Sequence, residues 1–273
     1  MKIETILTPA ELPALAQRDL RATACVVFDV LRATSTFVTA LHHGAQAIIP
    51  VSEIAEAVAL KNSKLKIKNS KSILLGGERN GVRISAEGID FDLGNSPREY
   101  RPEKVRGKII VSTTTNGTRA LRACVNAQTV LAASFLNLTA TAEFLRRENF
   151  TSVLLVCAGT GENTALEDVL AAGALCELLV ERDSVEPTLK SREIRARGTL
   201  APPHKIDSSD SAQIALLVWL EAKSDLAGAV SSSANARRLL AIPELREDVA
   251  FCLQQDICPL VARMGADGKI GCG

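Results

Sequence analysis

Two side chains of opposite charge follow an apolar run near the start of the chain. The run covers residues 25–28, and Asp29 and Arg32 come where a buried strand made of it would end. Hydroxyl residues suited to cap a helix come next, and Gly44 ends the helical pattern that they begin. Ligands of open α/β sheets bind outside the carboxyl ends of the strands, so this acid and base are placed for chemistry. The alternative is a local ion pair or a capped turn.

A second polar turn follows residues 108–111, which open the next strand-like unit. It holds four hydroxyl residues in a row and then Asn-Gly, directly before a helical pattern. Backbone N–H groups and hydroxyls at a helix N-terminus bind anions, whereas a capped turn without a ligand is the simpler alternative. The candidate anion-binding residues of this turn are Thr113, Thr114, Thr115, Asn116 and Gly117.

A third polar segment begins with Glu78 and Arg79, directly after the brief apolar run 73–75. It belongs to a stretch, residues 76–100, that is rich in Gly, Asn, Asp and Ser and lacks periodicity. Structureless segments of this length are uncommon inside compact domains and are usually functional or mobile. We predict a loop here, with Asn95 and Ser96 as further site candidates.

Glu167 and Asp168 lie in the first turn of a helix predicted over about 165–180. The simpler reading is that they complement the helix dipole. Together with Asp29, Glu78 and Glu162 they could share a cleft only with cations among them, because two unit charges about 4 Å apart repel by about 4 kcal/mol at an effective dielectric of 20. Arginines supply two cations, and a hard divalent metal held by oxygens is the natural third. An anion site, arginines and carboxylate-held Mg²⁺ together suggest phosphoryl chemistry.

The composition limits the class of protein. The 273 residues are 47% apolar and carry a formal net charge of +1, which gives no general attraction to nucleic acid or anionic membranes. No apolar run approaches the roughly 18 residues of a membrane span, and the first residues lack the apolar core of a signal peptide. The seven cysteines include no CxxC pair. We expect a cytoplasmic protein that binds neither nucleic acid nor membrane, and apolar helices near the C-terminus leave room for a homodimer.

The elements that must position these turns alternate between strand and helix. This alternation predicts a three-layer α/β/α fold with a largely buried mixed sheet, built as a single unit over residues 1–273. Segments 25–60 and 107–142 have the same order of elements, and a shift of 82 places Gly44 on Asn126, two residue types that accept left-handed backbone. We therefore predict an internal duplication with two similar halves. We also predict a final strand over 257–261 and an exposed excursion over about 183–207.

Four stretches give the chain a family resemblance. They are VVFDVLRATST, GGERNG followed by FDLGNSPREY, STTTNGTRAL, and AGTGENTALEDVLAAG. In this order they resemble the 2-phosphosulfolactate phosphatase family, the ComB-like proteins of coenzyme M biosynthesis. The resemblance implies an α/β/α fold with its own topology and a Mg²⁺-dependent acid phosphatase that converts 2-phospho-3-sulfolactate to 3-sulfolactate and phosphate.

Chemistry suggests roles for the matching residues as hypotheses. Asp29 and Asp168, with Glu78 or Glu167, would hold Mg²⁺. Arg32 and the turn 113–117 would neutralise the phosphoryl oxygens. The sulfonate or carboxylate of the ester would be gripped by Arg79, Asn95 and Ser96. Attack on phosphorus could come from a metal-activated water or from Asp29 itself.

Two rival functions remain open at this point. One is a phosphatase for another small acidic phosphoester that lacks the sulfonate. The other is a non-catalytic protein that binds an anionic metabolite, which would bind its ligand equally well without Mg²⁺ and release no phosphate.

Overall fold

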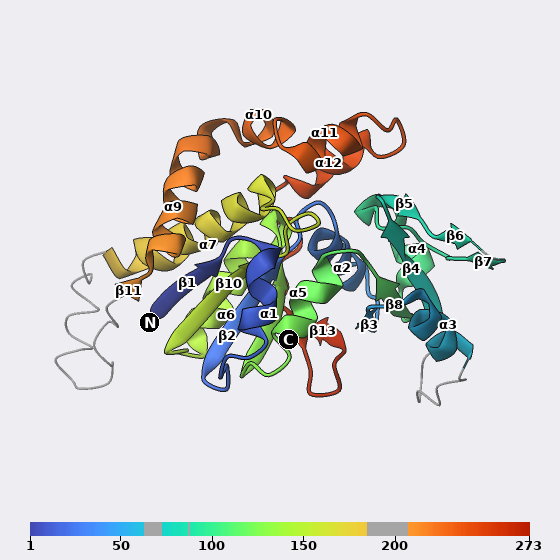
Figure 1. Ribbon diagram of the computed structural model, residues 1–273, viewed down its shortest axis with the longest axis horizontal. Helices are drawn as coiled ribbons and strands as arrows, with labels where there is room; N and C mark the ends of the chain where they lie inside the picture. The colour runs from blue at the N-terminus through green and yellow to red at the C-terminus, as the bar shows by residue number, and fades with distance from the viewer. Residues whose placement is uncertain (63–72, 87, 185–206) are drawn as a thin grey trace.

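The computed structural model describes residues 1–62, 73–86, 88–184 and 207–273 (Figure 1). Within these residues eleven strands form one sheet in the order β11-β1-β10-β2-β9-β12-β13-β3-β8-β4-β5. Their bounds are β1 (Lys2–Ile6), β2 (Thr23–Phe28), β3 (Ala47–Val51), β4 (Ile73–Arg79), β5 (Val82–Arg83), β8 (Ile109–Thr113), β9 (Thr129–Ala133), β10 (Ser152–Cys157), β11 (Asp207–Ser208), β12 (Ala262–Met264) and β13 (Ile270–Cys272). A separate hairpin pairs β6 (Ser85–Ala86) with β7 (Ile89–Asp90).

Helices cover the sheet on both sides, which confirms the predicted α/β/α class (Figure 1). They are α1 (Leu12–Leu15), α2 (Ala33–His42), α3 (Ile54–Asn62), α4 (Pro102–Val105), α5 (Gly117–Ala123), α6 (Leu138–Arg147), α7 (Leu166–Ser184), α9 (Asp210–Ala222), α10 (Leu226–Ser231), α11 (Ala234–Leu240) and α12 (Arg246–Cys252). Helices α10 to α12 lie across the top of the molecule in the view of Figure 1. None of the described helices is long and apolar enough to cross a bilayer.

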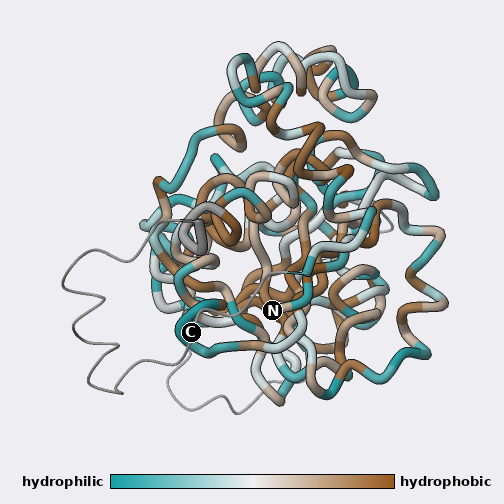
Figure 2. The backbone as a smooth tube through the Cα atoms, turned by 90° about the vertical axis from the view of Figure 1, so that its left-hand side faces the viewer, coloured by the Kyte–Doolittle hydropathy of each residue, from teal (hydrophilic) through white to brown (hydrophobic). Residues whose placement is uncertain are grey.

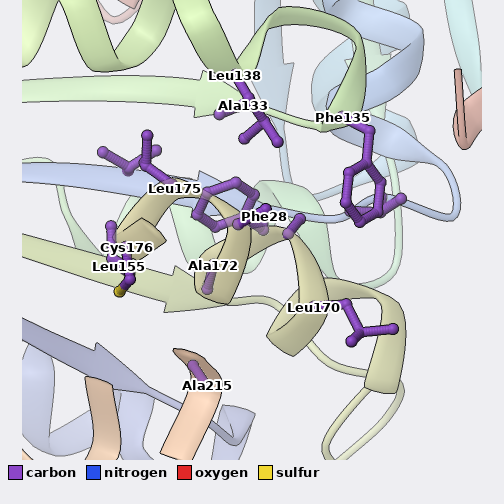
Figure 3. Packing of buried hydrophobic residues seen from close by; sticks show 14 of the residues in the cluster. Phe28, Ala133, Phe135, Leu138, Leu155, Leu170, Ala172, Leu175, Cys176 and Ala215 are labelled. Atoms are coloured by element: carbon purple, nitrogen blue, oxygen red, sulfur yellow. The ribbon is translucent and has the colours of Figure 1, made fainter. Parts of the chain in front are cut away.

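The central strands are apolar on both faces, as expected of parallel strands that helices cover on each side. In β2 every residue from Ala24 to Phe28 is buried, and β2 pairs in parallel with β9 and β10. Figure 3 shows Phe28, Leu155 and Leu175 lying together between the strands and α7. Hydrophobic segments accordingly run through the interior in Figure 2. This packing fixes where the strands end, and therefore where the polar turns begin.

A C-terminal hairpin joins two groups of parallel strands. Strand β12 pairs antiparallel with β9, and β13 pairs antiparallel with β3. The prediction of a final strand over 257–261 is wrong, because the strand begins only at Ala262. Pro259 lies inside the apolar run 257–261 and has no N–H to give to a ladder, so the run forms a loop in which Cys258 is buried.

The stretch 76–100 is more regular than predicted. Strand β4 continues to Arg79 and turns into β5 through Asn80 and Gly81, whose φ angles are 54° and 82°. Asn-Gly is the pair that favours a two-residue hairpin turn with positive φ at both positions. The prediction of a structureless loop missed this signal.

The internal duplication is not confirmed. Segments 25–60 and 107–142 share the order strand, helix, strand, helix, but Gly44 has a φ of +88° whereas Asn126 has no positive φ. The second strand of each segment also pairs with the other segment: β3 lies beside β8, and β9 lies beside β2. Of the predicted excursion 183–207, residues 185–206 lie outside the described residues.

Candidate active site

A polar cavity of about 210 Å³ lies where the turns after β2, β4, β8 and β10 meet. Six of the predicted site residues line it, namely Asp29, Arg32, Glu78, Asn95, Thr115 and Asn116. The other lining residues are Leu31, Asn80, Gly81, Thr160, Gly161 and Arg238. The carboxyl ends of strands far apart in sequence therefore deliver acids, bases and hydrogen-bonding groups to one place.

Asp29 is buried between the N-termini of two helices. Its Oδ1 accepts a hydrogen bond from the N–H of Ala33 in α2 at 3.1 Å, and the N–H of Gly117 in α5 also donates to this carboxylate. Position 117 needs glycine, since a Cβ there would lie 2.7 Å from Asp29 Oδ2. Burial first, and then the negative charges of Glu78 and Glu167, raise the pKa of Asp29 to about 7 against the two amides, which lower it. Asp29 can therefore exchange a proton near neutral pH.

Glu78 lines the cavity and forms hydrogen bonds to two different turns. Its Oε1 accepts hydrogen bonds from the N–H and the hydroxyl of Thr115, both at 2.9 Å. Its Oε2 accepts from the N–H of Gly81 at 2.6 Å. The β4–β5 hairpin and the turn before α5 are thus held by one carboxylate.

Arg32 is buried and fully oriented by two partners. Nη1 donates to Asp248 Oδ2 at 2.7 Å, and Nη2 donates to the carbonyl oxygen of Gly81 at 2.6 Å. Asp248 lies in α12 and is completely buried, and its Oδ1 accepts a hydrogen bond from the hydroxyl of Ser96 at 2.7 Å. Ser96 thus supports the partner of Arg32 and does not line the cavity.

Among the residues that sequence reasoning missed are two charged ones: Arg238, which lines the cavity, and Asp248, which pairs with Arg32. Asp248 is 216 positions from Arg32 and lies in a first helical turn, where an acid normally needs no further explanation. Arg238 belongs to α11, and nothing in the sequence separates it from its neighbour Arg237. Only the docking of the C-terminal helices brings Arg238 to the cavity and Asp248 to Arg32.

Asn235 connects α11 to the turn after β2. Its Nδ2 donates to the carbonyl oxygen of Leu31 at 2.6 Å and to Glu167 Oε1 at 3.0 Å. Its Oδ1 accepts from Nη2 of Arg238 at 2.7 Å. Glu167, predicted as a metal ligand, is fully buried beside Asn235 and does not line the cavity.

Asp168 also lies beside the cavity without lining it. Its Oδ1 accepts from the N–H of Val30 at 2.8 Å, and its Oδ2 accepts from the N–H of Gly159 at 3.0 Å. Burial raises the pKa of Asp168 well above its usual range, and the charges of Asp29 and Glu167 add to this shift. In this arrangement Asp168 connects the turns after β2 and β10.

Three further predicted residues have structural partners and do not line the cavity. The guanidinium of Arg79 donates to the carbonyl oxygen of Ser52 at 3.1 Å and to Thr113 Oγ1 at 3.0 Å, which links β3, β4 and β8. The hydroxyl of Thr114 accepts from the N–H of Thr118, in the first turn of α5, at 3.3 Å. The structure does not bring Arg79 to the place where a ligand of this cavity would lie.

A few groups of the cavity could serve as ligands of a hard metal ion. No group of three or more His, Cys, Asp or Glu residues in the described chain is arranged to hold a metal, so the predicted set of four carboxylates is not assembled. Mg²⁺, however, usually takes one or two carboxylates and keeps several waters. Asp29 and Glu78 line the cavity, as do Asn95 and Thr160, whose buried Oδ1 and Oγ1 have no hydrogen-bond partner among the described residues.

Comparison with known proteins places the chain in a protein family. A family model described as 2-phosphosulpholactate phosphatase matches residues 7–266. A relative from Caldanaerobacter subterraneus subsp. tengcongensis, named probable 2-phosphosulfolactate phosphatase, is 37% identical over 251 residues, which cover 92% of this chain and 91% of the relative. Relatives of the same name from Thermotoga petrophila and Clostridium acetobutylicum are 38% and 32% identical, with 85% and 96% of each chain covered.

Proposed function

Because this chain belongs to the 2-phosphosulpholactate phosphatase family and is a phosphoric monoester hydrolase, we propose that it hydrolyses 2-phospho-3-sulfolactate to 3-sulfolactate and phosphate with the help of Mg²⁺. One observation supports this cavity as the active site. Two buried carboxylates, Asp29 and Glu78, line the same cavity of about 210 Å³ as two guanidinium groups, Arg32 and Arg238. A small cavity with charged walls suits a small, highly charged ester.

The charges of ester and cavity favour a bound cation. The ester carries a phosphate, a carboxylate and a sulfonate, and the cavity adds Asp29 and Glu78. Of the two arginines, Arg32 is already paired with buried Asp248. Asp29 and Glu78 would hold Mg²⁺, which supplies neutralisation of the phosphoryl oxygens when bound.

The residues of the chain itself position the ester and move the proton. Arg32 is fixed in the turn that carries Asp29, so its remaining N–H groups can orient a phosphoryl group beside that carboxylate. Asn116 and Thr160 line the same cavity and offer further polar groups. Asp29, whose pKa is raised to about 7, takes part in the reaction itself. It either attacks phosphorus as a nucleophile or removes a proton from an attacking water as a base.

Chemical trapping separates these two roles of Asp29. If Asp29 attacks phosphorus, a single turnover stopped in denaturant leaves an acyl phosphate that borohydride reduces to homoserine at position 29. If Asp29 acts as a base, the peptide that contains it stays unmodified. Asp168, which also has a raised pKa but does not line the cavity, serves as the internal control and should be unmodified in both cases.

Phosphate release from a panel of small esters tests the activity. We expect the chain to release phosphate from 2-phospho-3-sulfolactate faster than from phosphoglycolate, and chelation of divalent cations should lower the rate. Arg32→Ala should lower kcat/KM at least 100-fold, whereas Arg21→Ala, at an exposed pair with Asp19, should not change it. Equal rates on the two esters would favour a substrate without a sulfonate. No phosphate release would leave only the non-catalytic binding protein.

Stabilisation by Mg²⁺ tests the ligand assignment apart from activity. We expect Mg²⁺ to raise the Tm of the unmodified protein and to lose this effect in Asp29→Asn and Glu78→Gln. Glu56→Gln, at a half-exposed position outside the cavity, should respond like the unmodified protein. A full Mg²⁺ response in both cavity variants would show that the ion binds elsewhere.

A further inference from the structure

Two guanidinium groups approach one point at the rim of the cavity. That point is where a Cβ would lie at Gly81: Arg238 Cζ is 3.8 Å and Arg238 Nη2 is 3.9 Å from it, and Arg32 Nη2 is 4.0 Å from it. The two arginines come from elements far apart in sequence, α11 and the turn after β2. Because like charges repel, such a pair calls for negative charge between or beside it.

The two arginines differ in how their charge is balanced. Arg32 is buried and forms an ion pair with Asp248 at 2.7 Å. Arg238 forms no ion pair with any described carboxylate, and its Nη2 donates a hydrogen bond to the neutral amide of Asn235. Arg238 also reaches solvent, so its remaining N–H groups are open to a ligand that enters the cavity. Its charge is therefore the one that an incoming anion can use.

Arg238 is held in place before any ligand arrives. Asn235 is buried and uses its amide group in three hydrogen bonds, to Leu31, Glu167 and Arg238. The bond to Leu31 fixes α11 against the residue next to Arg32. A fixed guanidinium loses less conformational entropy on binding and offers a planar fork that matches the oxygens of a carboxylate or sulfonate.

We propose that Arg238 binds the acidic group of the ester that is remote from phosphorus, its carboxylate or sulfonate, and so makes the enzyme prefer esters with a second acid. This inference rests on the proposed function. Arg32 lies in the turn of Asp29 and serves the phosphoryl group, whereas Arg238 comes from a different element and approaches from the Gly81 side. Arg79 cannot take this role in its present position, since its guanidinium is bound to Ser52 and Thr113.

The test compares esters with and without a second acid in two arginine variants. The panel contains 2-phospho-3-sulfolactate, phosphoglycolate, which has the carboxylate alone, 2-phosphoethanesulfonate, which has the sulfonate alone, and ethyl phosphate, which has neither. We expect Arg238→Ala to lower the ratio of kcat/KM for the acidic esters to that for ethyl phosphate by 10- to 100-fold, mainly through KM. Arg238→Lys should recover part of the ratio. Arg237→Ala removes the same charge from the same helix, outside the cavity, and should leave the ratio unchanged.

The pattern across the panel identifies the group that is bound. A loss confined to phosphoglycolate and the full ester assigns the carboxylate, and a loss confined to the two sulfonates assigns the sulfonate. An equal loss on all four esters, ethyl phosphate included, would overturn the proposal, because Arg238 would then act on the phosphoryl group or on the fold. An unchanged ratio would overturn it as well.

Binding of the product gives a readout that does not depend on turnover. Titration calorimetry with 3-sulfolactate should show binding at least 10-fold weaker in Arg238→Ala than in Arg237→Ala. If the unmodified protein hydrolyses none of the esters but binds 3-sulfolactate through Arg238, the proposed function fails and the assignment of Arg238 stands. If it hydrolyses them and Arg238→Ala binds 3-sulfolactate as tightly as the control, only the assignment fails.

Discussion

Three buried aspartates near the cavity are compensated in three different ways. Asp248 has a guanidinium partner, Arg32, and Asp168 receives two backbone N–H groups. Asp29 receives amides at two helix N-termini but lies close to other carboxylates, and its pKa is raised to about 7. Burying a charge is costly unless it is paired, so Asp248, which is paired with Arg32, serves the structure, whereas the two amides of Asp168 leave its pKa raised. The charge of buried Asp29 is compensated only in part, so a bound substrate or metal can stabilise it.

The raised pKa of Asp29 has a consequence for stability. Because its pKa is higher in the folded than in the unfolded protein, the folded state binds more protons between about pH 4 and 7, and the free energy of unfolding falls as the pH rises through this range. Asp29→Asn removes this loss. From pH 5 to pH 8 we expect the stability of this variant relative to the unmodified protein to improve by roughly 2.5 kcal/mol, since pH 5 lies about two units below the pKa and one pKa unit corresponds to about 1.4 kcal/mol. Urea unfolding without metal at both pH values measures this.

The control for this experiment is Glu56→Gln, a half-exposed acid outside the cavity. Its stability relative to the unmodified protein should be the same at pH 5 and pH 8. Asp168 also has a raised pKa, so some of the slope should persist in Asp29→Asn. A difference between Asp29→Asn and the unmodified protein that does not depend on pH would contradict the role assigned to burial.

The Arg32–Asp248 pair gives a second prediction at this scale. Asp248→Ala should destabilise the protein by roughly 3–5 kcal/mol, because it leaves a buried guanidinium without a counter-ion. Replacing both partners, as in Arg32→Met with Asp248→Leu, should recover part of this loss. Denaturant unfolding of the two singles and the double measures the coupling. Asp19→Ala, which breaks an exposed pair with Arg21, should change stability by no more than about 0.5 kcal/mol. Fully additive losses would mean that the buried pair is not coupled.

Among the elements, α7 connects the core with the site. Its first turn holds Glu167 and Asp168, and its buried face packs on β2 and β10 (Figure 3). On its other side it packs closely against α9, where Gly173 faces the backbone of Ala215 and Trp219 Nε1 donates to Glu177 Oε2 at 2.6 Å. The contact between α7 and α9 thus supports the carboxylates behind the cavity.

Gly173→Ala tests this helix contact. A Cβ at position 173 would overlap the carbonyl oxygen of Ala215 and the Cβ of Trp219, neither of which can turn away. Overpacking typically costs 1–3 kcal/mol, and the overlap with a backbone oxygen argues for the upper end; alanine gains about 1 kcal/mol over glycine in a helix, so we expect a net loss of up to about 2 kcal/mol. Thermal unfolding measures the change. Gly271→Ala, where a Cβ meets no atom within 4 Å, is the matched control. Equal stability of both variants would show that α7 and α9 can separate freely.

At the scale of the whole molecule, the C-terminal hairpin connects the two groups of parallel strands into one sheet. Strands β12 and β13 stand between β9 and β3 and so join the two parallel groups into one sheet. Ile270 in β13 is fully buried at this junction. Cavity residues come from both groups, Asp29 and Thr160 from one and Glu78 and Thr115 from the other. The homodimer and the cytoplasmic location stay predictions.

Removal of residues 262–273 tests the role of the hairpin. Without it β9 and β3 would each expose an unpaired edge and lose apolar cover, so we expect no cooperative unfolding transition and no phosphatase activity. Circular dichroism during urea unfolding measures the transition. Lys269→Ala changes only an exposed ion pair with Asp267 in the hairpin turn and should unfold like the full chain. A truncated chain with an unchanged transition would contradict this role.

The sequence by itself determined the family, the α/β class and most of the polar turns that form the cavity. These features follow from local patterns: apolar runs make buried strands, and the residues after them must lie at strand ends. Only the tertiary structure decided that Arg238 reaches the cavity, that Asp248 pairs with Arg32, that Arg79 is bound elsewhere, and that the last strands lie mid-sheet. Each of these depends on how distant helices and strands pack against one another, and the spacing of residues along the chain carries no record of such contacts.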